Sequence, residues 1–239
     1  MTIISWADLA WCLVPVVLVC LIYVAWHGKP SEILIATARM SVQLIGVGYV
    51  LVAIFENPSP WISLAIVSLM LVVAGWIAIR PVRHHPGFLA PALVALAGSV
   101  GLHLLISVNL VLDAESWFQP RLLIPLAGMY FANTMNAISL AAERYHAELH
   151  NGQPEPKARI TAFQAAMIPQ VNSLLAVGLV ALPGMMTGQI LAGVSPLTAV
   201  RYQVMIMSMV LGASGVGTAI MLWLLGRNGV PKMSSDDAG

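Results

Sequence analysis

The sequence predicts an all-α membrane protein, built as a bundle of transmembrane helices. Of its 239 residues, 59% are hydrophobic and only 9% are charged, whereas soluble domains carry about 25% charged residues. The mean hydropathy is +0.86. The apolar runs are about twenty residues long, the length that a helix needs to cross about 30 Å of hydrocarbon. A transmembrane barrel shows shorter segments of alternating polarity instead.

We expect seven spans in a single transmembrane domain, residues 1–239. They cover about 6–26, 33–55, 61–79, 88–112, 122–142, 161–182 and 202–225. Six spans, with 182–200 re-entrant, are the alternative count. The first run lacks a basic leading segment and a small-residue cleavage motif, so we expect it to be a retained span rather than a signal peptide.

The distribution of basic residues predicts how the bundle is oriented. One side collects Lys29, Arg80, Arg83, Arg144, Lys157, Arg159, Arg227 and Lys232. Only Arg121 and Arg201 fall near the other side. Because Lys and Arg accumulate in cytoplasmic loops, we expect the N-terminus outside and the C-terminus inside. The polar segment 143–160 is then a cytoplasmic loop.

Several function classes are disfavoured. A net charge of +1 does not fit a nucleic-acid partner, and 143–160, the longest polar stretch, is too short to fold as a catalytic domain. The phosphate-binding pattern G-x-x-x-x-G-K-[ST] does not occur in the sequence. No expected span has Asp or Glu at its centre, which argues against a proton-coupled transporter. The chain is therefore not expected to be an enzyme, and any nucleotide site is expected on another chain.

Polar side chains inside the spans are candidates for an interior pathway, because they are costly in lipid. Arg39 and Gln43 lie one turn apart in the second span, which would place them on one helix face. Asn133 and Asn136 in the fifth span and Asn172 in the sixth are the other candidates. Arg39 has the alternative of reaching the lipid headgroups. Packing between helices is the favoured role for the fifth-span asparagines.

Helix breaks are concentrated near the end of the chain. Pro169 lies inside the sixth span, and the segment "LPGMMTGQILAG" at 182–193 follows it. We expect Pro169, Pro183, Gly184 and Gly188 to form a hinge or gate, since proline kinks helices and broken helices line transport pathways. His103 stands alone in the fourth span. A hydrogen bond to a neighbouring helix is favoured for it over metal ligation.

Three strings carry a resemblance to a known family. They are "RMSVQLIGVGYVL", "LAGMYFANTMNAISL" and "IPQVNSLLAVGLVALPGMMTGQILAGVSPLTAVRYQ". Together they resemble the FetB-type iron export permeases, membrane subunits of ABC transporters, a family that includes plant aluminium-tolerance permeases. The similarity extends from about residue 33 to residue 225.

The resemblance implies a multi-pass permease of the bacterial inner membrane that exports iron or another metal or metabolite. It also implies a separate ABC ATP-binding subunit, which would carry ATP and Mg, with no cofactor in this chain. Two permeases would associate as a homodimer. Because the plant relatives have been linked to a nucleotide-sugar, the resemblance leaves an anion of that kind as an alternative substrate.

The resemblance has one departure. Family members usually carry a longer cytoplasmic stretch after the fifth span, with an "LGA" element that is missing from this position of the chain. We expect coupling to the ATPase to use the remaining loop, through Glu143, Arg144, His150, Lys157 and Arg159. The shortened loop also supports an alternative, a non-transporting membrane subunit derived from a permease that binds or regulates a partner.

Overall fold

The computed structural model describes residues 5–85 and 87–228. The predicted all-α fold is confirmed, since helices account for the regular structure in those ranges and no strand occurs there. The chain divides into two compact units, Met1–Asn57 and Pro58–Gly239.

The first unit is a helical hairpin. A short helix α1 (Trp6–Leu9) and a 3-10 turn η1 (Ala10–Cys12) lead into α2 (Leu13–Ala25), which packs against α3 (Pro30–Glu56). At the turn between them, His27 has a φ of 58° and the Gly28 N–H donates to the Tyr23 carbonyl at 2.7 Å. Nearly every described side chain of this unit is exposed and most are apolar. Such a hairpin requires lipid or protein around it.

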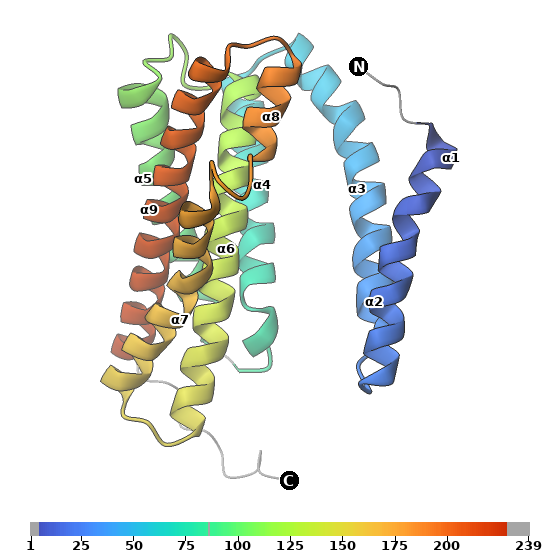
Figure 1. Cartoon of the computed structure of the whole chain (residues 1–239). Coiled ribbons are helices and arrows are strands. Elements are labelled where there is room, and N and C mark those ends of the chain that lie inside the picture. Colours follow the sequence, from blue (N-terminus) through green and yellow to red (C-terminus); the bar gives the residue numbers. More distant parts are fainter. Residues whose placement is uncertain (1–4, 86, 229–239) are drawn as a thin grey trace. The chain divides into compact units, whose positions relative to one another are not determined.

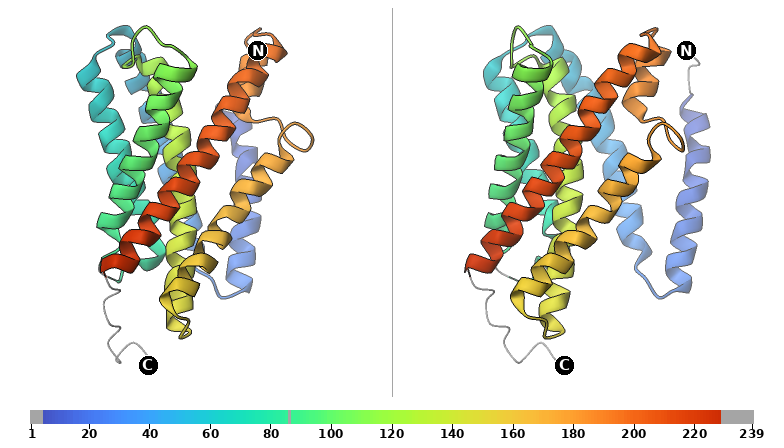
Figure 2. Two further views of the ribbon diagram at one scale, coloured as in Figure 1. Left: turned by 90° about the vertical axis from the view of Figure 1, so that its left-hand side faces the viewer. Right: turned by 60° about the vertical axis from the view of Figure 1, so that its left-hand side comes forward.

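The second unit is a bundle centred on three long helices. Its elements are α4 (Pro60–Ala78), η2 (Arg80–Val82), α5 (Leu89–Leu105), η3 (Ile106–Val111), α6 (Pro120–His150), α7 (Glu155–Ala176), α8 (Gly184–Leu191) and α9 (Pro196–Asn228). Helices α5, α6 and α9 pack on one another, α4 covers α5 and α6, and α7 lies along α6 and α9 (Figure 1, Figure 2). The turn η3 is π-helical and continues α5.

Proline determines where the long helices begin. Pro30, Pro60, Pro120 and Pro196 each open a helix, because the first turn needs no N–H donor from residue N1 and the ring presets φ for a helix. The sequence therefore marks these starts directly.

Five helical segments are long and apolar enough to cross a membrane, by length and composition. They are Ala7–Ala25, Pro30–Glu56, Pro60–Ala78, Leu89–Val111 and Pro196–Arg227. The first four agree closely with the expected spans. Helices α6 and α7 are long but more polar, so the number of spans stays a prediction.

Two expected boundaries differ from the structure. The expected loop 143–160 is mostly helical, because α6 continues to His150 and α7 starts at Glu155. Helix α7 also ends at Ala176, before the expected end of the sixth span at 182. The expected boundaries were placed where the apolar runs end. Glu, Arg, Ala and Leu favour helix in polar segments too, so a helix can continue past the end of an apolar run.

One end of the second unit collects the α4–α5 turn, the α6–α7 turn and the end of α9 (Figure 1, Figure 2). Arg80, Arg83, Lys157 and Arg227 belong to these segments. We refer to it as the basic end. Its cytoplasmic location stays a prediction, and Lys232 lies outside the described residues.

Candidate functional site

The chain breaks its helical pattern between α7 and α8. The peptide groups of Val180 and Ala181 donate back to the Ala176 carbonyl, and Gly178 donates to the Ala181 carbonyl at 3.0 Å. Gly178 has a φ of +87°, a conformation that glycine adopts without strain. The side chains of Leu179 and Val180 at the tip are 92% and 84% exposed. We call the segment 177–183 the α7–α8 turn.

The break lies earlier than the sequence predicted. The expected hinge 182–193 is mostly helical, since Gly184–Leu191 form α8. Pro183 precedes this helix, and its carbonyl accepts the Thr187 hydroxyl at 3.2 Å. Gly184 and Gly188 are helical, whereas Gly178 and Gly193 have positive φ. The predicted segment is therefore non-helical only at its two ends, at 182–183 and 192–193, because positive φ cannot be read from a glycine-rich string.

The turn lies part-way along the bundle rather than at its end. In both views α7 stops short of the far end of α9, and α8 continues beside α9 toward that end (Figure 1, Figure 2). Contacts between α8 and α9 hold this continuation in place. Helix α7, the α7–α8 turn and α8 therefore form one discontinuous helix. Pro169 lies within α7 on its exposed side.

The other pathway candidates lie on α6 and α7 of the second unit and on α3 of the first. Asn133 is half-buried in α6, and its amide donates to the Met129 carbonyl of the same helix at 2.8 Å. Asn136 and Asn172 are exposed on α6 and α7. In the first unit, Arg39 and Gln43 are exposed on α3.

A buried polar seam joins α5 to α6 and α9, and of its members the sequence singled out only His103 as a site candidate. Ser99 and His103 of α5 and Ser107 of η3 follow at intervals of four residues and are all buried. Ser107 donates to the His103 carbonyl at 2.7 Å, so the Tyr130 hydroxyl, also 2.7 Å away, donates to Ser107. The four-residue spacing was a usable signal for this stripe.

Two glycines of α9 lie directly against side chains of the seam. A β-carbon at residue 217 would lie 2.7 Å from Cγ2 of Thr134 and 2.8 Å from Oγ of Ser99. One at residue 212 would collide with the His103 ring. Gly212 and Gly217 thus allow α9 to pack closely against the seam. In the described structure, the hydroxyls of Thr134, Ser214 and Thr218 are buried without a hydrogen-bond partner.

His103 is held by its own helix. Its Nδ1 lies 2.7 Å from the Ser99 carbonyl, and a carbonyl only accepts, so Nδ1 carries the hydrogen. Within the described ranges, no group of three or more His, Cys, Asp or Glu side chains could hold a metal ion.

The basic end holds the residues expected to couple to an ATPase. Arg144 pairs with Glu148 along α6, and Nε of Arg159 lies 3.7 Å from Oε1 of Glu155 along α7. A β-carbon at residue 226 of α9 would meet the carboxylate of Glu155 and would lie 3.5 Å from a guanidinium nitrogen of Arg159, both at the ends of flexible side chains. Helices α7 and α9 therefore approach each other at this cluster. Glu143, His150 and Lys157 are exposed beside it.

Two further groups at this end were not identified from sequence. Burial, with the Glu155 carboxylate as a smaller cause, raises the pKa of the Tyr145 hydroxyl to about 12, so it stays neutral. The His85 and His146 rings lie 4.0 Å apart between centroids. Burial, followed by the charges of His85 and His150, lowers the pKa of His146. This contact fixes the α4–α5 turn to α6.

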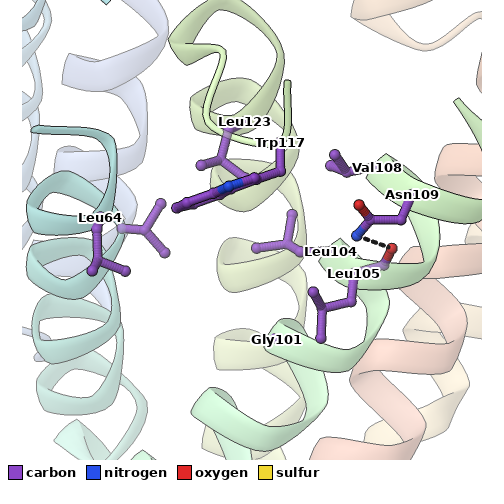
Figure 3. Close-up of a pocket in the computed structure, with 9 residues that line it drawn as sticks. Leu64, Gly101, Leu104, Leu105, Val108, Asn109, Trp117 and Leu123 are labelled. Carbon is purple, nitrogen blue, oxygen red and sulfur yellow. Dashed lines mark hydrogen bonds between the residues drawn. The ribbon is translucent and has the colours of Figure 1, made fainter. Parts of the chain in front are cut away.

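An apolar pocket of about 500 Å³ opens at the opposite end, between α4, α5, η3 and α6 (Figure 3). It is lined by Leu64, Val67, Gly101, Leu104, Leu105, Val108, Asn109, Trp117 and Leu123. Its one amide, that of Asn109, donates to the Leu105 carbonyl at 3.1 Å. The lining offers apolar contact and no charged group.

Comparison with known proteins identifies the family. The family model described as "Uncharacterised protein family (UPF0014)" matches residues 6–161 and 155–229. The chain belongs to this family. The resemblance seen in the sequence is confirmed, and the chain is a multi-pass membrane protein of a permease family.

Three relatives show the range of the family. The UPF0014 membrane protein slr1647 of Synechocystis sp. (strain ATCC 27184 / PCC 6803 / Kazusa) is 34% identical over 90% of this chain and 89% of the relative. The Probable iron export permease protein FetB of Escherichia coli (strain K12) is 31% identical over 82% and 81%. Protein ALUMINUM SENSITIVE 3 of Arabidopsis thaliana is 32% identical over 81% and 76%. No solved structure matches the chain.

Proposed function

We propose that the chain is the membrane permease subunit of an ABC exporter in the bacterial inner membrane. The observation that carries the proposal is its identity of 31% to the probable iron export permease over most of both chains. A helix interrupted within the bundle supports it, because interrupted helices in transporters mark binding sites and moving joints. The substrate is iron or another metal ion or metabolite.

A separate ATP-binding subunit would supply the energy, and it would bind ATP and Mg. The basic end is the surface we propose for its attachment, where Glu155 and Arg159 of α7 meet Gly226 of α9. Only residues 151–154 separate α6 from α7, so a push on this turn would move both helices together. The permease would act as a homodimer with two such subunits.

The test is a reconstitution of the full chain with a candidate ABC ATP-binding subunit from the same cell. Membrane vesicles would be supplied with ATP and either labelled iron or a labelled nucleotide-sugar. Transport of iron supports the metal exporter, and transport of the nucleotide-sugar supports the anion alternative. A partner subunit lacking its phosphate-binding lysine serves as the control. If the two chains co-purify and neither compound is transported, the result contradicts the exporter and supports the non-transporting alternative.

A further inference from the structure

Helix α7 presents two different faces. Its buried residues, Ala158, Ala162, Ala166 and Gln170, repeat every four residues and lie on the side packed against α6 and α9. The opposite side carries Ile160, Gln164, Ile168, Asn172, Ser173 and Leu175, which are all exposed. We call this exposed side the outer face of α7.

The outer face of α7 is unlike a lipid-facing surface. The exposed residues of α4 show what lipid requires, since they are apolar apart from Ser68 and include Leu69, Val72 and Trp76. Helix α7 lies along α9, a candidate span, yet it is not itself apolar enough to be one. Unpaired amides are costly in hydrocarbon. If α7 crosses the membrane beside α9, Gln164 and Asn172 require polar partners outside the bundle.

The α7–α8 turn leads to the same requirement. Non-helical backbone is tolerated at membrane depth only where protein or a water-filled cavity covers it. The turn lies part-way along α9, and its tip residues Leu179 and Val180 are almost fully exposed. A partner that covers α7 alone would leave this backbone exposed. The covering surface must extend over both.

We propose that a second copy of this chain covers the outer face of α7 and the α7–α8 turn. Residues 160–200 contain no charged residue and no histidine, so two copies of this face meet without charge repulsion. The exposed amides of Gln164 and Asn172 each donate and accept, which allows them to pair with their own equivalents across a twofold axis. The two interrupted helices would then lie together along the line between the copies.

The inference identifies the interface of the homodimer named in the proposed function, on which it rests. Disulfide cross-linking of the full chain in native membranes tests it without any transport assay. In a Cys12→Ala, Cys20→Ala background, single cysteines replace Gln164, Ile168, Asn172 or Leu175 in turn. Matched controls place the cysteine on α4, as Leu69→Cys, Val72→Cys and Trp76→Cys. All of these side chains are exposed, so the core packing stays intact.

After mild oxidation, at least one α7 position is expected to move most of the chain to twice the monomer mass. The α4 positions are expected to remain monomeric. No cross-linked dimer at any α7 position, or equal yields on α4, would overturn the interface. Loss of ATP-dependent transport has no effect on this readout. A cross-linked dimer without transport would contradict the proposed exporter and support the interface. Transport without cross-linking would support the exporter and contradict the interface.

Discussion

The imidazole ring of His103 lies against Gly212, with Nε2 in the space that a β-carbon at residue 212 would need. The ring has little freedom to move away, because Nδ1 donates to the Ser99 carbonyl at 2.7 Å. Helices α5 and α9 therefore approach closely at this level only because residue 212 has no side chain.

Gly212→Ala is expected to destabilise the fold by about 1–3 kcal/mol, the usual cost of overpacking a well-packed contact. The free energy of unfolding in SDS, followed by far-UV circular dichroism, measures it. Gly215→Ala is the matched control on the same helix, since its β-carbon would lie 3.6 Å from Cε of Met167, an ordinary contact. Both variants replace a helical glycine with alanine, so the gain in helix propensity is the same. Equal free energies of unfolding for the two variants would therefore contradict the His103 contact.

The Ser107–Tyr130 hydrogen bond is expected to respond asymmetrically to mutation. Tyr130→Phe removes the donor but leaves Ser107 bonded to the His103 carbonyl, and should cost about 1 kcal/mol. Ser107→Ala leaves a buried phenol without its acceptor, which costs about 1–3 kcal/mol. The same SDS titration distinguishes them. A larger loss for Tyr130→Phe than for Ser107→Ala would reverse the donor assignment.

The His85–His146 contact predicts a pH-dependent stability at the basic end. The folded state lowers the pKa of His146 below its ordinary value of 6.5, so the unfolded chain takes up the proton first. Stability therefore falls as the pH drops through 6.5 and levels off below the folded-state pKa. Melting temperatures of the purified chain in detergent, measured across this range, would show the decline.

His146→Phe keeps an aromatic ring against His85 and removes the titrating group. Its melting temperature should depend less on pH than that of the unmodified chain. His84→Gln, at an exposed neighbouring position, is the control and should keep the original slope. An unchanged slope in His146→Phe would assign the pH dependence to another group.

The sequence predicted the elements better than it predicted the site. Long apolar runs identified α2 to α5 closely, because the hydrophobic length of a span is a local property of the sequence. The His103 seam was harder. Ser99 and Ser107 look unremarkable singly, and only packing shows that Tyr130 and two glycines of α9 meet them.

Glycine-rich segments exposed another limit of the sequence. Gly178, Gly184, Gly188 and Gly193 appear equivalent as letters, yet only Gly178 and Gly193 have positive φ. Which glycine permits the turn depends on where Ala176 and Gln189 find hydrogen-bond donors after their helices end. Those partners arise from the folded chain, so the sequence could indicate a break in the helix but not its exact position.

The positive-φ glycines give a direct test of the interrupted helix. Gly178→Ala and Gly193→Ala force an L residue into left-handed backbone, which costs about 1–2 kcal/mol each. Gly184→Ala and Gly188→Ala add a β-carbon that meets nothing within 4 Å and keep helical backbone. In ATP-dependent vesicle transport, the first pair should slow export while the second pair retains it. The paired substitution Pro183→Ala, Gly184→Ala tests whether the start of α8 is a joint, and unchanged transport with normal insertion would overturn the hinge expected there.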